Sequence, residues 1–172
     1  MTDSMEIAAG SRGHRNSPLA HAALAVVPVV ATAALGSWAT LPNVPTWYAG
    51  LAKPPVTPPN GAFGPAWTFL YGLMAYAVWR VLSAPPSTPG RDRAVALFFV
   101  QLALNAAWSW SFFAAHSPGA GLVNILLLDA AVAATIVAVR QVDNVAGLVM
   151  VPYFLWIAYA TYLNAGIWLL NG

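Results

Sequence analysis

The chain has 172 residues, of which 59% are hydrophobic and only 7% are charged. An ordinary soluble domain is excluded, because such domains carry about 25% charged residues to face water. Intrinsic disorder requires low hydrophobicity, and nucleic-acid binding requires a basic surface that a net charge of +2 does not supply. With no cysteine, disulfides and thiolate chemistry are also excluded. The remaining class is an integral membrane protein.

Mostly apolar stretches, each long enough to cross a bilayer as a helix, follow one another along the chain. They cover residues 19–41, 62–82, 94–115, 119–139 and 145–170. We therefore predict an all-α integral membrane protein, a five-transmembrane-helix bundle that forms one domain over residues 19–172. Residues 1–18 are expected to form a flexible cytosolic tail. The first stretch is too long for a signal peptide and leads directly into further spans.

The basic residues indicate the orientation of this bundle. Six of the seven fall in the tail or near the connections on the same side: Arg12, Arg15, Arg80, Arg91, Arg93 and Arg140. Lys53 is alone on the other side. The positive-inside rule places the N-terminus in the cytoplasm and the C-terminus outside. The short chain and this bias favour a bacterial inner (cytoplasmic) membrane, with the outer mitochondrial membrane as the alternative for a eukaryotic source.

Residues 42–61 connect the first two spans and are here called the cap loop. Prolines make this loop stiff, because each ring fixes φ. We predict an ordered cap over the outer end of the bundle, and the alternative is an interfacial loop whose aromatic side chains anchor at the headgroups. The residues expected to build the cap are Trp47, Lys53, Pro54, Pro58 and Pro59.

The third span carries two different faces. Gln101, Asn105, Trp108 and Phe112 recur at spacings of three and four and therefore share a polar and aromatic face. Small residues recur every fourth position on the other face, a pattern that lets helix backbones approach closely. This small face predicts either a homodimer contact or helix packing within one bundle; it consists of Ala103, Ala107, Ser111 and Ala115.

Aromatic faces also occur on the second and fifth spans, at a similar depth below the cap loop. The second span aligns Trp67 with Tyr71, and the fifth aligns Tyr153, Trp156 and Ala160. If these faces converge with that of the third span, they enclose an aromatic cavity. Separate structural pairing of each indole and amide group is the alternative.

Asp129 lies in the middle of the fourth span, where a carboxylate is costly and is by default a functional hypothesis. The simplest interpretation is a protonated carboxyl group hydrogen-bonded to a neighbouring helix. A proton pathway would need further ionisable groups along the span, and the sequence shows none.

The cap loop and second span read Trp47-Tyr48-x-x-Leu51-x-Lys53-Pro54 and Pro65-x-Trp67-x-x-Leu70-Tyr71. The third span reads Gln101-x-x-Leu104-Asn105-x-x-Trp108, and the fifth reads Pro152-Tyr153-x-x-Trp156-x-x-x-Ala160-x-x-Leu163-Asn164. This series strongly resembles the TspO/MBR family, which includes the tryptophan-rich sensory proteins, the translocator proteins and the peripheral-type benzodiazepine receptor. The resemblance covers roughly residues 38–171.

The resemblance implies a five-helix bundle, often dimeric, that binds protoporphyrin IX and also haem or other hydrophobic aromatic ligands. Matching motif positions would make Tyr48, Trp67, Asn105, Trp108, Trp156 and Ala160 ligand-binding residues. The helical faces add Tyr71 and Tyr153 to this set. The chain departs from the family at two positions. Val56 follows Pro54-Pro55, where many relatives carry Trp just before the paired prolines. The family's cholesterol-recognition pattern needs a basic residue after the tyrosine of the fifth span, and none follows Tyr162, so we do not expect sterol binding.

Three functions compete at this stage. The first is a membrane binding and sensory protein for tetrapyrroles, with the lipid bilayer and a second copy of the chain as partners and no obligatory cofactor. The second is a transporter of porphyrins or related amphipathic ligands. The third is light-dependent breakdown of bound porphyrin, with Trp67 and Trp156 as the photochemical residues. No catalytic residue set or metal site is predicted, and none of His14, His21 and His116 falls on the expected cavity faces.

Overall fold

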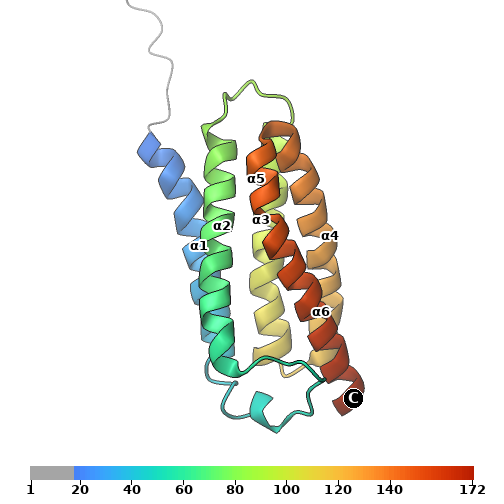
Figure 1. The fold of residues 1–172 in the computed structure, drawn as a ribbon. Helices are drawn as coiled ribbons and strands as arrows, with labels where there is room; N and C mark the ends of the chain where they lie inside the picture. The colour runs from blue at the N-terminus through green and yellow to red at the C-terminus, as the bar shows by residue number, and fades with distance from the viewer. Residues whose placement is uncertain (1–17) are drawn as a thin grey trace, which may run out of the picture.

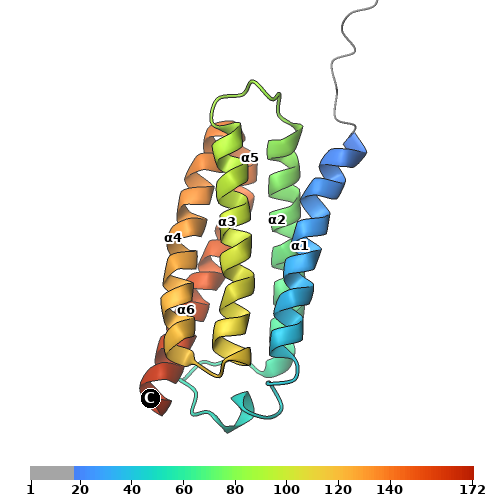
Figure 2. The ribbon, with the colours of Figure 1, turned by 180° about the vertical axis from the view of Figure 1, so that it is seen from behind.

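The computed structural model describes residues 18–172, so the tail predicted for residues 1–18 lies outside the described part except for Pro18. Long helices stand side by side in one bundle (Figures 1 and 2), and no strand occurs among the described residues. The α-helices are α1 (Pro18–Thr40), α2 (Phe63–Ser83), α3 (Arg91–Ser109), α4 (Pro118–Val142), α5 (Asn144–Val149) and α6 (Val151–Asn171). The α2–α3 connection closes one end of the bundle, and the cap loop closes the other (Figure 1).

Within residues 18–172, four helical segments are long and apolar enough to cross a membrane. They are α1, α3 with the turn that follows it (Arg91–Ala114), α4, and α5 together with α6 (Asn144–Asn171). The second predicted span, α2, is not among them, because its tryptophans, tyrosines and glycines are less hydrophobic than aliphatic residues. It still packs within the bundle between α1 and α3 (Figure 2).

The third and fifth predicted spans are less regular than expected. The third ends in a π-helical turn, η3 (Trp110–Ala114), in which the Ala115 amide donates to the Trp110 carbonyl. The fifth is not one helix, because α5 and α6 are separated at Met150. Pro152, at the start of α6, has no N–H to continue the α-helical bonding and therefore breaks the helix at this point.

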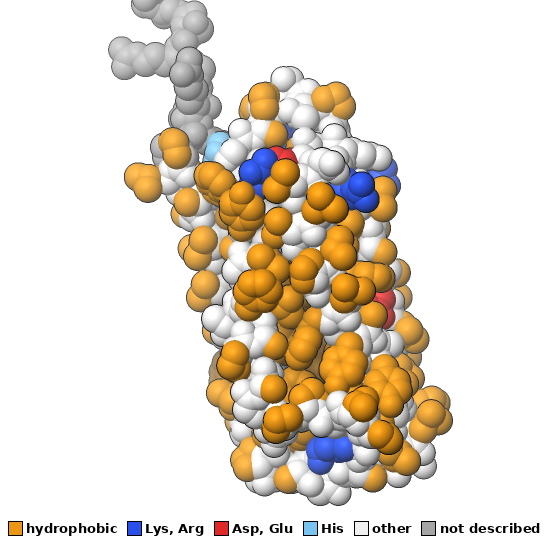
Figure 3. All heavy atoms as spheres, viewed as in Figure 1, with side chains coloured by type: hydrophobic (Ala, Val, Ile, Leu, Met, Phe, Trp, Pro, Cys, Tyr) orange, Lys and Arg blue, Asp and Glu red, His pale blue; other side chains and the backbone are white. Residues whose placement is uncertain are grey.

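The bundle core combines small and large apolar side chains. Ala25, Met74, Ala94, Val132 and Tyr153 are completely buried. Alanines at these helix contacts allow close packing, which drives helix association where lipid already surrounds the apolar surface. Many large apolar side chains are exposed on the outside of the bundle, and hydrophobic side chains are spread over the face drawn in Figure 3. Such a surface suits lipid rather than water.

Charged side chains gather near the end with the α2–α3 connection (Figure 3). Arg80 Nη2 lies 2.7 Å from Asp143 Oδ2, and Arg80 Nε donates to the same oxygen at 2.9 Å. Asp143 Oδ1 also accepts from the Ala146 amide at 2.8 Å and so caps the start of α5. This ion pair ties α2 to the junction of α4 and α5.

The pair predicts a pH dependence of stability. The hydrogen bond from Arg80 holds the pKa of Asp143 below its usual value. In the unfolded chain the pKa of Asp143 is about 4. Because its pKa is lower in the folded protein, the ion pair stabilises the fold fully above this unfolded value, and this stability is lost as the pH falls through the folded pKa. Because both side chains are partly exposed, we expect a loss of about 1 kcal/mol in unfolding free energy.

Denaturant unfolding at neutral and acidic pH measures this loss. Asp143→Asn keeps a capping oxygen for Ala146 but removes the charge, so the variant should be less stable than wild type only at neutral pH. A difference between variant and wild type that persists unchanged in acid would contradict the ion-pair account.

Candidate functional site

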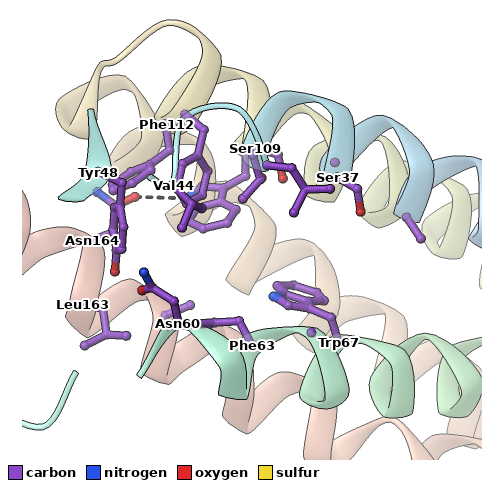
Figure 4. Close-up of a pocket in the computed structure, with 18 of the residues that line it drawn as sticks. Ser37, Val44, Tyr48, Asn60, Phe63, Trp67, Ser109, Phe112, Leu163 and Asn164 are labelled. Atoms are coloured by element: carbon purple, nitrogen blue, oxygen red, sulfur yellow. Dashed lines mark hydrogen bonds between the residues drawn. The ribbon is translucent and has the colours of Figure 1, made fainter. Parts of the chain in front are cut away.

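A cavity of about 350 Å³ lies directly beneath the cap loop, between α1, α2, α3 and α6 (Figure 4). Its volume lies in the lower part of the range of small-molecule sites. Aromatic side chains from the cap loop, α2, α3, the turn after α3 and α6 line it: Tyr48, Phe63, Trp67, Tyr71, Trp108, Phe112, Phe113 and Trp156. The structure therefore brings the predicted aromatic faces together around one space.

Two tryptophans of the wall come from α2 and α6. The rings of Trp67 and Trp156 are 6.4 Å apart and nearly perpendicular, at 83°. Trp67 also lies 5.3 Å from the Tyr71 ring at a tilt of 30°. Ala160, one turn further along α6 than Trp156, lines the same space and leaves it open because its side chain is a methyl group.

Asn105 and Tyr153 do not line the cavity, although the sequence placed them there. Both are buried beneath Tyr71 in a chain of side-chain hydrogen bonds. Tyr71 Oη donates to Asn105 Oδ1 at 2.9 Å, and Asn105 Nδ2 donates to Tyr153 Oη at 3.0 Å. Tyr153 Oη donates in turn to Gln101 Oε1 at 3.0 Å. These residues form a floor that fixes the position of Tyr71.

Trp108 is held in the wall by a second polar contact. Its Nε1 donates to Asn164 Oδ1 at 3.0 Å, and Asn164 Nδ2 donates to the Pro118 carbonyl at 2.7 Å. The ring of Phe112 stacks on Trp108 with centroids 5.5 Å apart. Asn164 itself lines the cavity. The indole therefore has one fixed orientation and presents its surface to the cavity.

The predicted cap residues Trp47, Lys53, Pro54, Pro58 and Pro59 lie outside the cavity lining. Trp47 stacks on His116 at 4.7 Å and meets the edge of Phe112 at 5.5 Å. Lys53 Nζ donates to the Leu51 carbonyl at 3.0 Å and lies 4.6 Å above the Tyr48 ring. From the cap loop, Val44, Tyr48 and Asn60 reach the cavity wall.

Contacts with α6 hold the far half of the cap loop. Asn171 forms a reciprocal pair with Ala52, because its Oδ1 accepts from the Ala52 amide and its Nδ2 donates to the Ala52 carbonyl, both at 2.9 Å. Tyr159 Oη donates to the Val56 carbonyl at 2.6 Å. Val56 has a φ of 64°, a left-handed conformation that is unfavourable for a β-branched residue. The loop is therefore fastened across the open end of the bundle.

The cavity face of α1 was missed at the sequence level. Ala33, Gly36, Ser37 and Thr40 line the cavity from this helix (Figure 4 labels Ser37). Ser109 of α3 lies close to this face, since a Cβ on Gly36 would be 3.2 Å from the Ser109 hydroxyl oxygen. The signal in the sequence is the spacing of small residues, which is also common in ordinary helix packing.

The four small residues predicted to share one face of the third span do not lie in one row along the helix. Ala103 and Ala115 are exposed, whereas Ala107 and Ser111 are half-buried. The π-helical turn begins between Ala107 and Ser111 and adds a residue to the turn, which rotates Ser111 and Ala115 relative to the first two.

The described residues hold no group of three His, Cys, Asp or Glu side chains that could bind a metal ion. The fold and the cavity define a helical, multi-pass membrane protein with an aromatic cavity at one end of its bundle. The TspO/MBR family profile matches residues 24–169, which is most of the chain. The chain belongs to the TspO/MBR family.

Named relatives come from archaea, bacteria and animals. The tryptophan-rich protein TspO of Archaeoglobus fulgidus is 44% identical over 149 residues, covering 85% of this chain and 94% of the relative. The human translocator protein is 42% identical over 125 residues, covering 71% and 73%. Protein CrtK of Rhodobacter capsulatus is 36% identical over 148 residues, covering 86% and 92%.

Proposed function

We propose that this chain is a membrane-embedded binding and sensory protein for flat aromatic tetrapyrroles, with protoporphyrin IX as the representative ligand. The observation that carries this proposal is the aromatic cavity, in which Trp67, Trp108 and Trp156 face one space beneath a fastened loop. An extended aromatic ring gains from apolar burial and from each aromatic contact, which contributes about 0.5–1.5 kcal/mol beyond burial.

Polar groups in the lining support a ligand that also carries acidic substituents. Ser37, Thr40 and Asn60 line the cavity on the side of the cap loop. Lys53 is the nearby cation, and it would have to leave the Leu51 carbonyl to reach a propionate group. His21 and His116 are not among the lining residues, so haem would bind through its ring faces and not through an iron–histidine bond.

Filling the cavity should abolish binding. Ala160→Phe places a ring in the space that the alanine leaves open, and we expect saturable binding of protoporphyrin IX to be lost. Fluorescence titration in detergent measures binding, and circular dichroism checks that the helices remain.

Ala158→Phe is the matched control, because Ala158 is exposed on the same helix and does not line the cavity. It should bind as wild type does. Equal binding by both variants would place the ligand elsewhere on the protein.

Transport of porphyrins or related amphipathic ligands is a second candidate. The cavity is lined partly by residues that are exposed on the outside of the bundle: Ser37 of α1, Leu41 directly after α1, and Gly64 and Thr68 of α2. A ligand could therefore exchange with the bilayer between these helices, and the human relative is named translocator protein. Flux of protoporphyrin IX into sealed vesicles would distinguish transport from binding alone.

Light-dependent breakdown of bound porphyrin is a third candidate. The perpendicular rings of Trp67 and Trp156 flank the cavity, where they would meet a photoexcited ligand. Illumination of the complex with oxygen, followed by absorbance, would test it against the Trp67→Phe and Trp156→Phe variants.

We also propose that all five predicted spans cross the membrane, α2 included, with α5 and α6 forming the last span. The basic residues Arg80, Arg91, Arg93 and Arg140 then face the cytoplasm of a bacterial cell, and the cap loop lies outside. We also propose a homodimer contact along α3 that includes the exposed Ala103, because a small side chain there lets a second helix approach closely.

A further inference from the structure

Asp129 occupies the seam between α4 and α6, away from the cavity. It is half-buried in the middle of an apolar helix. Its Oδ2 lies 2.8 Å from the Thr161 hydroxyl oxygen of α6, and its Oδ1 is buried without a hydrogen-bond partner. Neither ion pair within residues 18–172 involves Asp129.

The Thr161 hydroxyl group has two acceptors within reach but only one proton. Its oxygen lies 2.8 Å from Asp129 Oδ2 and 3.0 Å from the Ile157 carbonyl oxygen. If Asp129 is ionised, a single hydroxyl is its one donor and its other oxygen remains unpaired. If Asp129 carries a proton, it donates to Thr161, and Thr161 donates to the Ile157 carbonyl. The protonated form therefore satisfies both contacts.

Within residues 18–172, the elements packed against Asp129 place no charged side chain beside it that would favour ionisation. Tyr153 of α6 is a titratable side chain that interacts electrostatically with Asp129. The charged residues of α3 are confined to its first turn, at Arg91, Asp92 and Arg93, and α5 and η3 contain none. On α4 itself, Arg140 lies in the last turn.

The same stretch of α6 also forms the cavity wall. Thr161 contacts Asp129 of α4 and Ile157 is buried in the core, whereas Trp156 and Ala160, their immediate neighbours, line the cavity. The helix is interrupted at Met150, between α5 and α6. A change at the Asp129–Thr161 contact would therefore act on the helix that carries part of the cavity wall.

We propose that Asp129 and Thr161 form an intramembrane proton-binding site whose occupancy is coupled to the cavity through α6. The bound proton keeps α6 packed on α4 and keeps the cavity in the shape described above. Release of the proton to water leaves a charge in the seam, loosens the α4–α6 contact and weakens ligand binding. The coupling rests on the proposed tetrapyrrole function, whereas the proton site does not.

Infrared spectroscopy tests the proton site directly. In a detergent or ether lipid without carbonyl groups, wild type at neutral pH should show the C=O band of a protonated carboxyl group. This band should be absent from Asp129→Asn and unchanged in Asp92→Asn, whose side chain is exposed. Thr161→Val should shift the band because the carboxyl group loses its partner. No such band in wild type, or the same band in Asp129→Asn, would overturn the proposal.

Protoporphyrin IX titrations at several pH values test the coupling. Between about pH 6 and about pH 9, wild type and Asp92→Asn should lose affinity about fivefold more than Asp129→Asn does, since asparagine remains neutral and can still donate to Thr161. The propionates of the ligand also titrate, but they change binding to all three proteins equally and therefore cancel in the comparison. Identical pH profiles would overturn the coupling. Absence of binding by wild type at every pH would instead overturn the proposed function, and the infrared band would still decide the proton site.

Discussion

Replacing Asn105 by leucine should lower the free energy of unfolding by about 2 kcal/mol. Asn105 is 3% exposed and joins Tyr71 to Tyr153, so leucine removes both hydrogen bonds at once. The hydroxyl of Tyr71 loses its acceptor, and that of Tyr153 loses its donor. Leucine has the same branched shape and the same number of side-chain heavy atoms as asparagine, which limits the packing defect.

Unfolding in mixed micelles, followed by circular dichroism, measures this loss. Asn124→Leu is the matched control, because the Asn124 side-chain oxygen is buried without a hydrogen-bond partner and leucine should be tolerated there. Equal losses in the two variants would show that the floor beneath Tyr71 does not stabilise the bundle.

Replacing Gly166 by leucine should detach the cap loop. A Cβ at this position would lie 2.8 Å from Pro54 Cγ and 2.9 Å from Pro54 Cβ, closer than real side chains approach. Because the proline ring is fixed to its backbone, it has no rotamer by which to avoid the new side chain. The loop must therefore move, at a cost of about 1–3 kcal/mol.

Hydrogen exchange at the Ala52 amide reports this movement, since that amide donates to Asn171. We expect exchange to accelerate about tenfold or more, in line with such a cost. Gly72→Leu serves as the control, because nothing lies within 4 Å of a Cβ at Gly72. Unchanged protection of Ala52 in Gly166→Leu would mean that Pro54 does not fasten the cap to α6.

Helical periodicity is sufficient to predict much of the cavity wall. Trp67 and Tyr71, Asn105 and Trp108, and Trp156 and Ala160 are each three or four residues apart on one helix, so the face that each pair shares is visible in the sequence. The same periodicity does not show which side chains pair with one another. Asn105 therefore appeared to be a wall residue, whereas it is buried between Tyr71 and Tyr153.

The remaining differences have local causes. The α1 face was overlooked because alanine, glycine and serine indicate helix packing as readily as a cavity. The break at Met150 depends on where Pro152 falls within its helix, and hydrophobicity alone does not show this. The π-helical turn after Ser109 has no sequence signature in this chain that we could identify.

The most direct test of the central claim is a titration of protein tryptophan fluorescence with protoporphyrin IX in darkness. Wild type is compared with the double variant Trp67→Phe, Trp156→Phe, which keeps aromatic rings but removes both indoles. The account predicts saturable quenching with a dissociation constant of micromolar order in wild type and weaker binding in the variant. Equal, non-saturating quenching in both proteins would mean that the porphyrin only partitions into the micelle, and it would contradict a binding site in this cavity.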